Sequence, residues 1–371
     1  MMLADMASIH IDPRQTKVDL CQFVAQGILR RSRLDEASDN LKQEIQETIE
    51  HKAQGVFLWA HLILDILRWQ TTEDDIRQCL HTAPSGIEDM ITELLKVYAI
   101  DLKEEEAEEF NTILVWLSCA TCPLRYIELE AALQRQSPSR SKALPLVDHL
   151  LGTYALLLEI RHEDGVCMIA RSSDDQPGSE DSSTISESTV VVFAHASIDE
   201  YFQKELSKFS RRRTVIPIGV ERAEAELKML RTCLAVLIET RQAGCLDTLQ
   251  ALRTYAKESW AHHLSSCVIG KVDCTRRSDK LAKLQKDITS LLYRVLNEEE
   301  VLEVWCRDTT WQFFHGDLAP TTAKFVLAST ERYPDLVPVL PASWLQCCKE
   351  RPYEPLRPIA EIYVKEGLQG N

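Results

Sequence analysis

A histidine, a serine and a glutamate stand close together where a strand-forming run gives way to a helical pattern. The run Thr189 to Ala194 precedes His195, and Ser197 and Glu200 follow with the spacing S-x-x-E. These three residue types can form a nucleophilic triad, but no G-x-S-x-G elbow exposes this serine. The spacing instead predicts that Ser197 and Glu200 cap the next helix and that local backbone satisfies His195.

Two cysteines have the spacing of redox and zinc sites. Cys119 and Cys122 form a C-x-x-C pair, yet no second such pair and no histidine pair completes a zinc-ribbon or zinc-finger pattern. We therefore interpret both residues as packed or partly exposed thiols.

A second group of cysteines and histidines lies further along the chain. A zinc ion there would take its ligands from His262, His263, Cys267 and Cys274, of which His263 and Cys267 share one helical face. His263 also falls on the apolar stripe of that helix with Trp260, which favours a core histidine. We expect no metal, and zinc at these residues is the alternative.

The chain offers no glycine-rich loop for a nucleotide phosphate. A P-loop reads G-x-x-x-x-G-K-[ST], and its backbone amides and lysine hold the phosphates. The Gly270-Lys271 pair has Ser265 at the first glycine position and Val272 where serine or threonine would bind Mg²⁺. We expect no nucleotide hydrolysis, no catalytic residue and no cofactor, so the chain is predicted not to be an enzyme.

The chain is strongly acidic. Its 57 Asp and Glu residues outnumber 42 Lys and Arg residues and give a net charge of −15. That charge repels nucleic acids and anionic membranes. Two basic groups are explained as solvated helix faces or linkers, namely Arg211 to Arg213 and the set Arg276, Arg277, Lys280, Lys283 and Lys286. We expect neither a nucleic acid nor a membrane as partner.

Composition and periodicity predict a mostly α-helical protein. The 371 residues include only 12 Gly and 14 Pro, and 45% are hydrophobic, so the chain is globular with few turn-forming residues for a large sheet. Between Asn40 and Leu67, apolar residues recur at steps of three and four, which predicts one long helix with a buried second half. Trp59 lies in that half and is expected to anchor a helical domain over residues 1–105.

A change of period predicts a second domain over residues 106–213. Three helices are expected at Glu106 to Cys119, Leu124 to Gln136 and Ala143 to Leu151, and β-forming runs follow at Ala155 to Ile160, Val166 to Ala170 and Thr189 to Ala194. Three helices followed by a small hairpin is the order of a winged helix. Residues 171–188 are rich in Ser, Asp and Glu and are expected to form a disordered insertion in the wing.

Helical periodicity returns after Arg213 and continues to a proline-rich end. Residues 214–371 are therefore expected to form an irregular α-superhelical array. Many winged helices bind DNA through their third helix, but this one offers only Lys142 beside Asp148 and His149. A DNA-binding winged helix is kept as an alternative.

Four stretches of the chain resemble, in order, motifs of fungal NACHT-type signalling proteins, members of the STAND class of NTPases. They are GVFLWAHLILDIL (Gly55 to Leu67), VWLSCATCPLRYIELEAAL (Val115 to Leu133), VFAHASIDEYF (Val192 to Phe202) and TYAKESWAHHL (Thr254 to Leu264). Their structural positions here are Gly55, Phe57, Trp59, Trp116, Pro123, Leu124, Ser197, Glu200, Tyr201, Trp260 and His263. Family members typically carry Arg before the Pro-Leu of the second motif, where this chain has Cys122.

The resemblance implies a domain order and a role. An NTPase core comes first in such proteins, followed by a helical domain, a winged helix of the type also called the GPI inositol-deacylase winged-helix domain, and a helical repeat array. This chain begins where the core would be ending. The resemblance also implies that the winged helix holds an NTPase core inactive while the array reads a partner. It makes His195 a candidate nucleotide-sensing residue, because a histidine at a similar junction contacts ADP in related proteins.

The start of the chain lacks a basic and apolar leader, so the twelve cysteines are interpreted as reduced thiols in the cytoplasm. The most apolar stretch, Val56 to Leu67, is much shorter than the roughly 20 residues that span a bilayer. The sequence thus predicts a non-catalytic regulatory protein that binds other proteins. The resemblance offers an NTPase core in trans as one such partner, and a degenerate gene product is the other interpretation of a chain with these parts alone. An enzyme with an unrecognised site is a further alternative.

Overall fold

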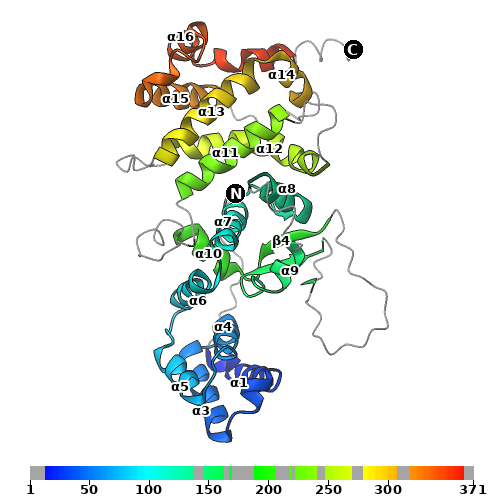
Figure 1. Cartoon of the computed structure of the whole chain (residues 1–371), viewed down its shortest axis with the longest axis vertical. Coiled ribbons are helices and arrows are strands. Elements are labelled where there is room, and N and C mark those ends of the chain that lie inside the picture. The colour runs from blue at the N-terminus through cyan, green and yellow to red at the C-terminus, as the bar shows by residue number, and fades with distance from the viewer. Residues whose placement is uncertain are drawn as a thin grey trace, which may run out of the picture. The chain divides into compact units, whose positions relative to one another are not determined.

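The computed structural model describes residues 13–136, 146–162, 167–168, 188–205, 218, 222–239, 247–269, 279–306 and 317–362. The protein is mostly α-helical with one small antiparallel sheet, which confirms the predicted fold class (Figure 1). Among the described residues, none of the helices combines the length and the apolar character needed to cross a membrane. The predicted insertion at 171–188 lies outside the described residues except for Ser188.

The chain forms two compact units, which we call unit 1 and unit 2. Unit 1 comprises Met1–Ala107, Ala194–Gln203 and Thr214–Ile218, and unit 2 comprises Glu108–Phe193, Lys204–Arg213 and Gly219–Asn371. The predicted domain boundaries lie at residues 105 and 213. The first boundary is close to that of unit 1, whereas the sheet and the C-terminal helices share unit 2. The three-domain division stays a prediction.

Unit 1 is built from helices. In chain order they are α1 (Pro13–Leu29), α2 (Ser32–Asp35), α3 (Asp39–Ala53), α4 (Phe57–Leu67), α5 (Glu73–Thr82), α6 (Ile87–Asp101) and most of α10 (Ala196–Glu205). Helix α4 contacts α1, α3, α5 and α6 and is therefore the centre of the bundle. A Cβ atom added at Gly27 of α1 would lie 2.7 Å from Leu64 Cδ1 of α4, so glycine permits this close helix contact.

The single helix predicted between Asn40 and Leu67 is wrong. The helix breaks after Ala53, because Gln54 and Gly55 adopt left-handed backbone conformations with φ of 48° and 85°. The backbone N–H of Val56 donates to the Ala53 carbonyl at 2.8 Å and closes the turn. Gly55 takes this conformation without strain, and the turn separates α3 from α4.

Trp59 is buried at 1% exposure, as predicted, and anchors the core of unit 1. Its indole Nε1 donates to the Pro84 carbonyl at 3.0 Å, which joins α4 to the turn between α5 and α6. The neighbouring motif residue Phe57 is 37% exposed and makes an edge contact with Phe23, with ring centroids 5.6 Å apart. The N-terminal end of α4 is thus buried on the side of Trp59 and partly exposed on the side of Phe57.

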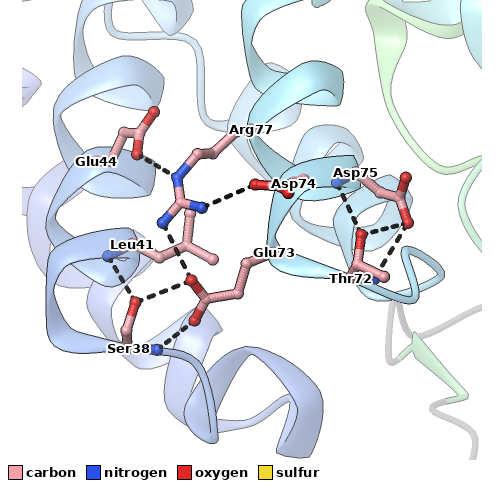
Figure 2. A network of polar contacts seen from close by, with 8 residues as sticks. All are labelled: Ser38, Leu41, Glu44, Thr72, Glu73, Asp74, Asp75 and Arg77. Atoms are coloured by element: carbon pink, nitrogen blue, oxygen red, sulfur yellow. Dashed lines mark hydrogen bonds and ion pairs between the residues drawn. The ribbon is translucent and has the colours of Figure 1, made fainter.

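Ser38 and Glu73 join the N-termini of α3 and α5 (Figure 2). The Ser38 hydroxyl accepts from the Leu41 backbone N–H at 3.4 Å and caps α3. The Glu73 carboxylate accepts from the Ser38 backbone N–H at 2.9 Å and from its hydroxyl at 3.1 Å. Arg77 donates to Glu73 and to Glu44 of α3, each at 3.1 Å. The side chains of Ser38, Glu44, Glu73 and Arg77 tie α5 to α3 at the surface of unit 1.

Helix α5 also has a complete capping box. The Thr72 hydroxyl accepts from the Asp75 backbone N–H at 3.1 Å, and the Asp75 carboxylate accepts from the Thr72 backbone N–H at 3.2 Å (Figure 2). This reciprocal pair satisfies two helix-end donors that would otherwise have only solvent.

The first part of unit 2, where a winged helix was predicted, combines three helices with the small antiparallel sheet. Its elements in chain order are α7 (Glu104–Cys119), β1 (Leu124–Arg125), α8 (Tyr126–Gln136), α9 (Leu146–Leu151), β2 (Leu158–Arg161), β3 (Cys167–Met168) and β4 (Val190–Phe193). The sheet order is β1-β4-β2-β3 and all pairs are antiparallel. Val191 of β4 faces Leu124 of β1 on one side and Ile160 of β2 on the other, and all three are buried.

The strand β1 is a correction to the predicted helix that began at Leu124. Leu124 and Arg125 pair with β4, and α8 begins at Tyr126. The first strand therefore lies between the first and second helices of this domain. Its pairing makes β4 a central strand.

The rest of unit 2 is helical. Its elements are α11 (Arg222–Glu239), α12 (Asp247–Ile269), α13 (Asp279–Asn297), α14 (Glu299–Cys306), α15 (Leu318–Arg332), η4 (Pro334–Leu336), α16 (Ala342–Glu350) and η5 (Glu354–Leu356). Helices α11 and α12 run side by side, and α11 also contacts α13 (Figure 1). Helix α12 contacts α8, which explains why the array and the winged helix form one unit.

Candidate functional site

His195 stands at the start of α10, where Ala196 is the first helical residue. Its ring Nδ1 accepts from the backbone N–H of Ser197 at 3.0 Å, and its carbonyl accepts from Ile198 at 3.0 Å. His195 therefore takes the capping role that we predicted for Ser197, which is already inside the helix. Because Nδ1 is an acceptor, the proton of the neutral ring is on Nε2.

The side chain of His195 is exposed, and the atom of Ser197 that meets its ring is a backbone nitrogen. A nucleophilic serine would instead present its hydroxyl to the imidazole. Glu200 lies on the exposed surface of the same helix. The arrangement is thus that of a helix start.

Tyr201 attaches α10 to α6. Its side chain is 3% exposed, and its hydroxyl lies 2.9 Å from the Thr92 hydroxyl. The ring also makes an edge contact with Phe202 at 5.3 Å between centroids. This motif residue has a packing role in unit 1.

A buried polar chain crosses unit 2 and is its most organised polar feature. Tyr255 Oη lies 2.9 Å from His263 Nε2, and His263 Nδ1 lies 2.8 Å from Glu226 Oε2. The Thr121 backbone N–H donates to Tyr255 Oη at 3.4 Å. His263, Glu226 and Tyr255 are 0%, 2% and 2% exposed. We call this set the Tyr255–His263–Glu226 chain.

The residues of the Tyr255–His263–Glu226 chain and its neighbours come from three parts of unit 2. Tyr255, Ser259 and His263 are four residues apart in α12 and share one face. Glu226 comes from α11, and Thr121 comes from the connection between α7 and β1. The Thr121 and Ser259 hydroxyls lie 2.6 Å apart and add a second link. The second and fourth sequence motifs therefore meet at this place.

One arrangement of protons satisfies both ring nitrogens of His263. Neutral His263 with its proton on Nδ1 donates to Glu226, and Nε2 accepts from the Tyr255 hydroxyl, which in turn accepts from the Thr121 N–H. The second carboxylate oxygen of Glu226 has no hydrogen bond within the described residues and lies 3.7 Å from Arg222 Nε. The chain leaves both nitrogens of His263 engaged.

The predicted alternative of zinc at His263 and Cys267 gains no support from this geometry, because no ring nitrogen of His263 is free to bind a metal. Cys274 lies outside the described residues. Within the part of the chain that the structure describes, no group of three or more His, Cys, Asp or Glu side chains has an arrangement that could hold a metal ion.

The cysteines near the Tyr255–His263–Glu226 chain have raised pKa values, which favour the protonated thiol. Burial raises the pKa of Cys119 to about 12 and raises that of Cys267 well above its ordinary value. Cys122 is exposed, and partial burial raises its pKa as well. Raised pKa values suppress the reactive thiolate, so the C-x-x-C pair lacks the electronic signature of a redox site.

The predicted third helix of the winged helix corresponds to α9, which has only six residues and packs against neighbouring side chains. Leu146 and Leu150 are buried, and His149 Nδ1 lies 3.2 Å from Glu109 of α7. Stacking of Phe110 on Tyr154, with ring centroids 4.4 Å apart, covers the same region. Within its bounds α9 carries no Lys or Arg. Lys142 lies outside the described residues.

The basic groups singled out in the sequence are only partly described. Arg211 to Arg213, Arg276 and Arg277 lie outside the described residues, whereas Lys283 is exposed on α13. Lys286 forms an ion pair with Asp335 and lies 5.3 Å from the ring of Tyr333. Lys286 therefore has partners within the array.

A second buried carboxylate, Asp65, lies in the apolar helix α4 of unit 1. Arg31, the residue before α2, donates to its Oδ1 through Nε at 3.2 Å and through the terminal nitrogen at 2.7 Å. Asp65 lies within the apolar stretch Val56 to Leu67, and no role was predicted for it. A carboxylate in an apolar helix is a sequence signal for a basic partner, because a buried charge is costly unless it is paired.

Comparisons of the chain with protein-family models, with curated proteins and with solved structures found no match. The resemblance to NACHT-type proteins therefore rests on the four motifs of the sequence.

Proposed function

We propose that this protein is a non-catalytic regulatory protein that acts by binding another protein, and that it corresponds to the post-NTPase part of a NACHT-type STAND protein. The observation that carries the proposal is the sheet order β1-β4-β2, with β1 between the first two helices. This order of helices and strands is the one expected of a winged helix and therefore supports the proposal. The proposed partner is an NTPase core in trans, and the proposed location is the cytoplasm.

The link between winged helix and array supports a regulatory role. Thr121 leads into the first strand of the winged helix, and Tyr255 and His263 belong to the array. Because the connection is buried and hydrogen-bonded, a partner that displaced α12 would also disturb the turn before β1. A rigid winged helix coupled to a helical array is suited to pass on such a displacement.

The chemistry of the described groups does not favour the enzyme alternative. Perturbed pKa values that mark active sites usually create a reactive form near neutral pH. Here burial raises the pKa values of Tyr98, Tyr255, Cys119 and Cys267, which keeps each of them protonated. Nor does the acidic and apolar α9 favour DNA binding, because base readout in the major groove requires basic or amide side chains on that helix.

The proposal can be tested with a fungal NACHT-type NTPase core whose own winged-helix and array segments have been deleted. Mixed with the full chain, the core should form a complex detectable by light scattering on a sizing column, and its ATP turnover should fall about tenfold, equivalent to about 1.4 kcal/mol. Val191→Asp, at a buried position of β4, should abolish both effects, whereas Val339→Asp, at a position 67% exposed, should preserve them.

A panel of such cores that forms no complex with the wild-type chain would refute the proposed partner. Equal inhibition by the Val191→Asp and Val339→Asp variants, with Val191→Asp unfolded by circular dichroism, would refute the role of the winged helix.

A further inference from the structure

One face of α4 leaves aromatic and basic side chains uncovered. Phe57 and His61 are four residues apart, and Arg68 follows at the end of the helix on the same face, with Trp69 next to it. Phe57 is 37% exposed and Trp69 is 66% exposed, and the side chains of His61 and Arg68 are 44% and 45% exposed. We call these four residues the α4 face.

A buried carboxylate lies beneath this face and is already neutralised. Asp65, whose side chain is 8% exposed, accepts two hydrogen bonds from Arg31, which is itself 16% exposed. Arg68 is 3.7 Å from the same oxygen, and His61 Nε2 is 3.8 Å from the other. Since Arg31 satisfies the carboxylate, Arg68 and His61 are additional basic groups held near it at longer range.

The α4 face is therefore locally positive on an acidic chain. The charged groups that act on His61 are Asp65, Arg31 and Arg68, which amounts to two guanidinium groups against one carboxylate. Burial lowers the pKa of His61, so the positive charge at neutral pH comes from the arginines. The whole chain carries −15, which makes this excess of positive charge a local exception.

The aromatic side chains hold the basic groups in place. The Arg68 guanidinium lies 4.7 Å from the centre of the Trp69 ring, a distance at which the ring attracts the cation. Phe23 contacts both Phe57 and His61, with ring centroids 5.6 Å and 6.5 Å apart. Arginine, tryptophan and other aromatic residues dominate the energetics of protein interfaces, because they combine area with directed polar contacts.

We propose that the α4 face binds an acidic segment of a partner protein. A carboxylate of that segment pairs with Arg68, and apolar side chains of the segment pack against Phe57 and Trp69 at the two ends of α4. The inference rests on the proposed function, that the chain acts by binding proteins, and adds the chemistry of the surface that is bound. A carboxylate segment fits better than a nucleic acid, because a long polyanion is repelled by the net charge of −15.

A labelled synthetic peptide tests the inference with the full chain. The probe is a short run of glutamates interrupted by one leucine and one phenylalanine, and its comparison peptide has glutamine in place of every glutamate. Fluorescence anisotropy at low salt measures the Kd of each peptide. The acidic peptide should bind about tenfold more tightly than the glutamine peptide, and Arg68→Gln should weaken the acidic peptide about tenfold.

Arg231→Gln is the matched control, since the Arg231 side chain is also 45% exposed and also lies near a carboxylate, that of Asp287 at 3.1 Å. It should leave the Kd of the acidic peptide unchanged. Equal binding of the acidic and glutamine peptides, or equal losses in the two arginine variants, would overturn the inference. Tighter binding of a single-stranded oligothymidylate than of the acidic peptide would overturn it in favour of a phosphate ligand.

The same variants separate this inference from the proposed function. If the NTPase core binds the wild-type and Arg68→Gln chains equally and the acidic peptide does not bind, the α4 face is wrong and the proposed function stands. If the acidic peptide binds through Arg68 and no NTPase core forms a complex, the α4 face stands and the proposed partner is wrong.

Discussion

At the scale of single residues, Trp59 shows how one side chain serves both packing and polar satisfaction. It is 1% exposed, and its Nε1 donates to the Pro84 carbonyl. Removing it leaves a large cavity and an unpaired carbonyl. Trp59→Ala should lower the free energy of unfolding of unit 1 by about 3 to 5 kcal/mol, as measured by urea titration.

Trp69 is the matched control, because it is 66% exposed. Trp69→Ala should change the free energy of unfolding by no more than about 0.5 kcal/mol. Similar losses for the two variants would show that Trp59 does not anchor the core.

Tyr255 tests the energetic value of the buried polar chain. Tyr255→Phe keeps the ring, which lies 5.5 Å from that of Trp116, and removes only the hydroxyl that joins Thr121 to His263. The variant leaves His263 Nε2 buried without a donor, so we expect a loss of about 1 to 3 kcal/mol in unfolding free energy. Tyr353→Phe, at a position 69% exposed, should be neutral. If Tyr255→Phe lost no more unfolding free energy than Tyr353→Phe, the Tyr255–His263–Glu226 chain would add nothing to stability.

His195 gives a prediction that separates a local role from a role in binding. Its Nδ1 accepts the N–H of Ser197 at the start of α10. His195→Ala should cost about 0.5 to 2 kcal/mol in thermal or urea unfolding, and His195→Asp, which is a good helix cap, should restore most of that loss. If His195→Asp restores stability but not binding of the NTPase core, the imidazole itself contacts the partner; restoration of both would assign His195 to capping alone.

At the scale of elements, the contact between the N-termini of α3 and α5 depends on pH. Hydrogen bonds from the backbone and then the side chain of Ser38 lower the pKa of Glu73. The folded pKa is thus below the unfolded value of about 4.3, so the stabilisation is complete above that value and is lost as pH falls through the folded pKa. Glu73→Gln should flatten the fall in unfolding free energy between about pH 5 and pH 3.

Asp74→Asn is the control for this pH profile, since the Asp74 side chain is 96% exposed although it also contacts Arg77. It should keep the parent's pH dependence. Identical profiles for the parent and Glu73→Gln would mean that Glu73 is not linked to folding.

The elements also show what the sequence can and cannot predict. Helical periodicity correctly located most helices, because burial of one face imposes it directly. It did not detect the break at Gln54 and Gly55, since two left-handed residues leave the apolar pattern on both sides almost in phase. The strand β1 was missed because two residues carry no period, and only pairing with β4 makes Leu124 and Arg125 a strand.

The candidate site, too, could be predicted from the sequence only in part. His263 could be placed in the core from its apolar stripe with Trp260, which is 0% exposed. Its partner Glu226 could not be predicted, because it belongs to another helix and no local pattern relates the two. In the same way, the pairing of Asp65 with Arg31 joins residues 34 positions apart, and no local pattern relates the two. Long-range polar pairs are set by tertiary packing.

At the scale of the whole molecule, each compact unit has its own core. Trp59, Leu41 and Ile45 are buried in unit 1, and Trp116, Phe110 and Trp260 are buried in unit 2. A core that is complete within one unit can unfold without exposing the other, so a two-state transition for the whole chain is not expected. We predict two overlapping transitions in scanning calorimetry of the full chain.

The residue variants assign these transitions, because each removes contacts from one core only. Trp59→Ala should lower the midpoint of one transition, and Tyr255→Phe should lower the other by about 2 to 4 °C per kcal/mol lost, the usual scale for units of this size. Each variant should leave the transition of the other unit within a degree. A single transition that both variants shift equally would mean that the two cores unfold together, and it would contradict this prediction.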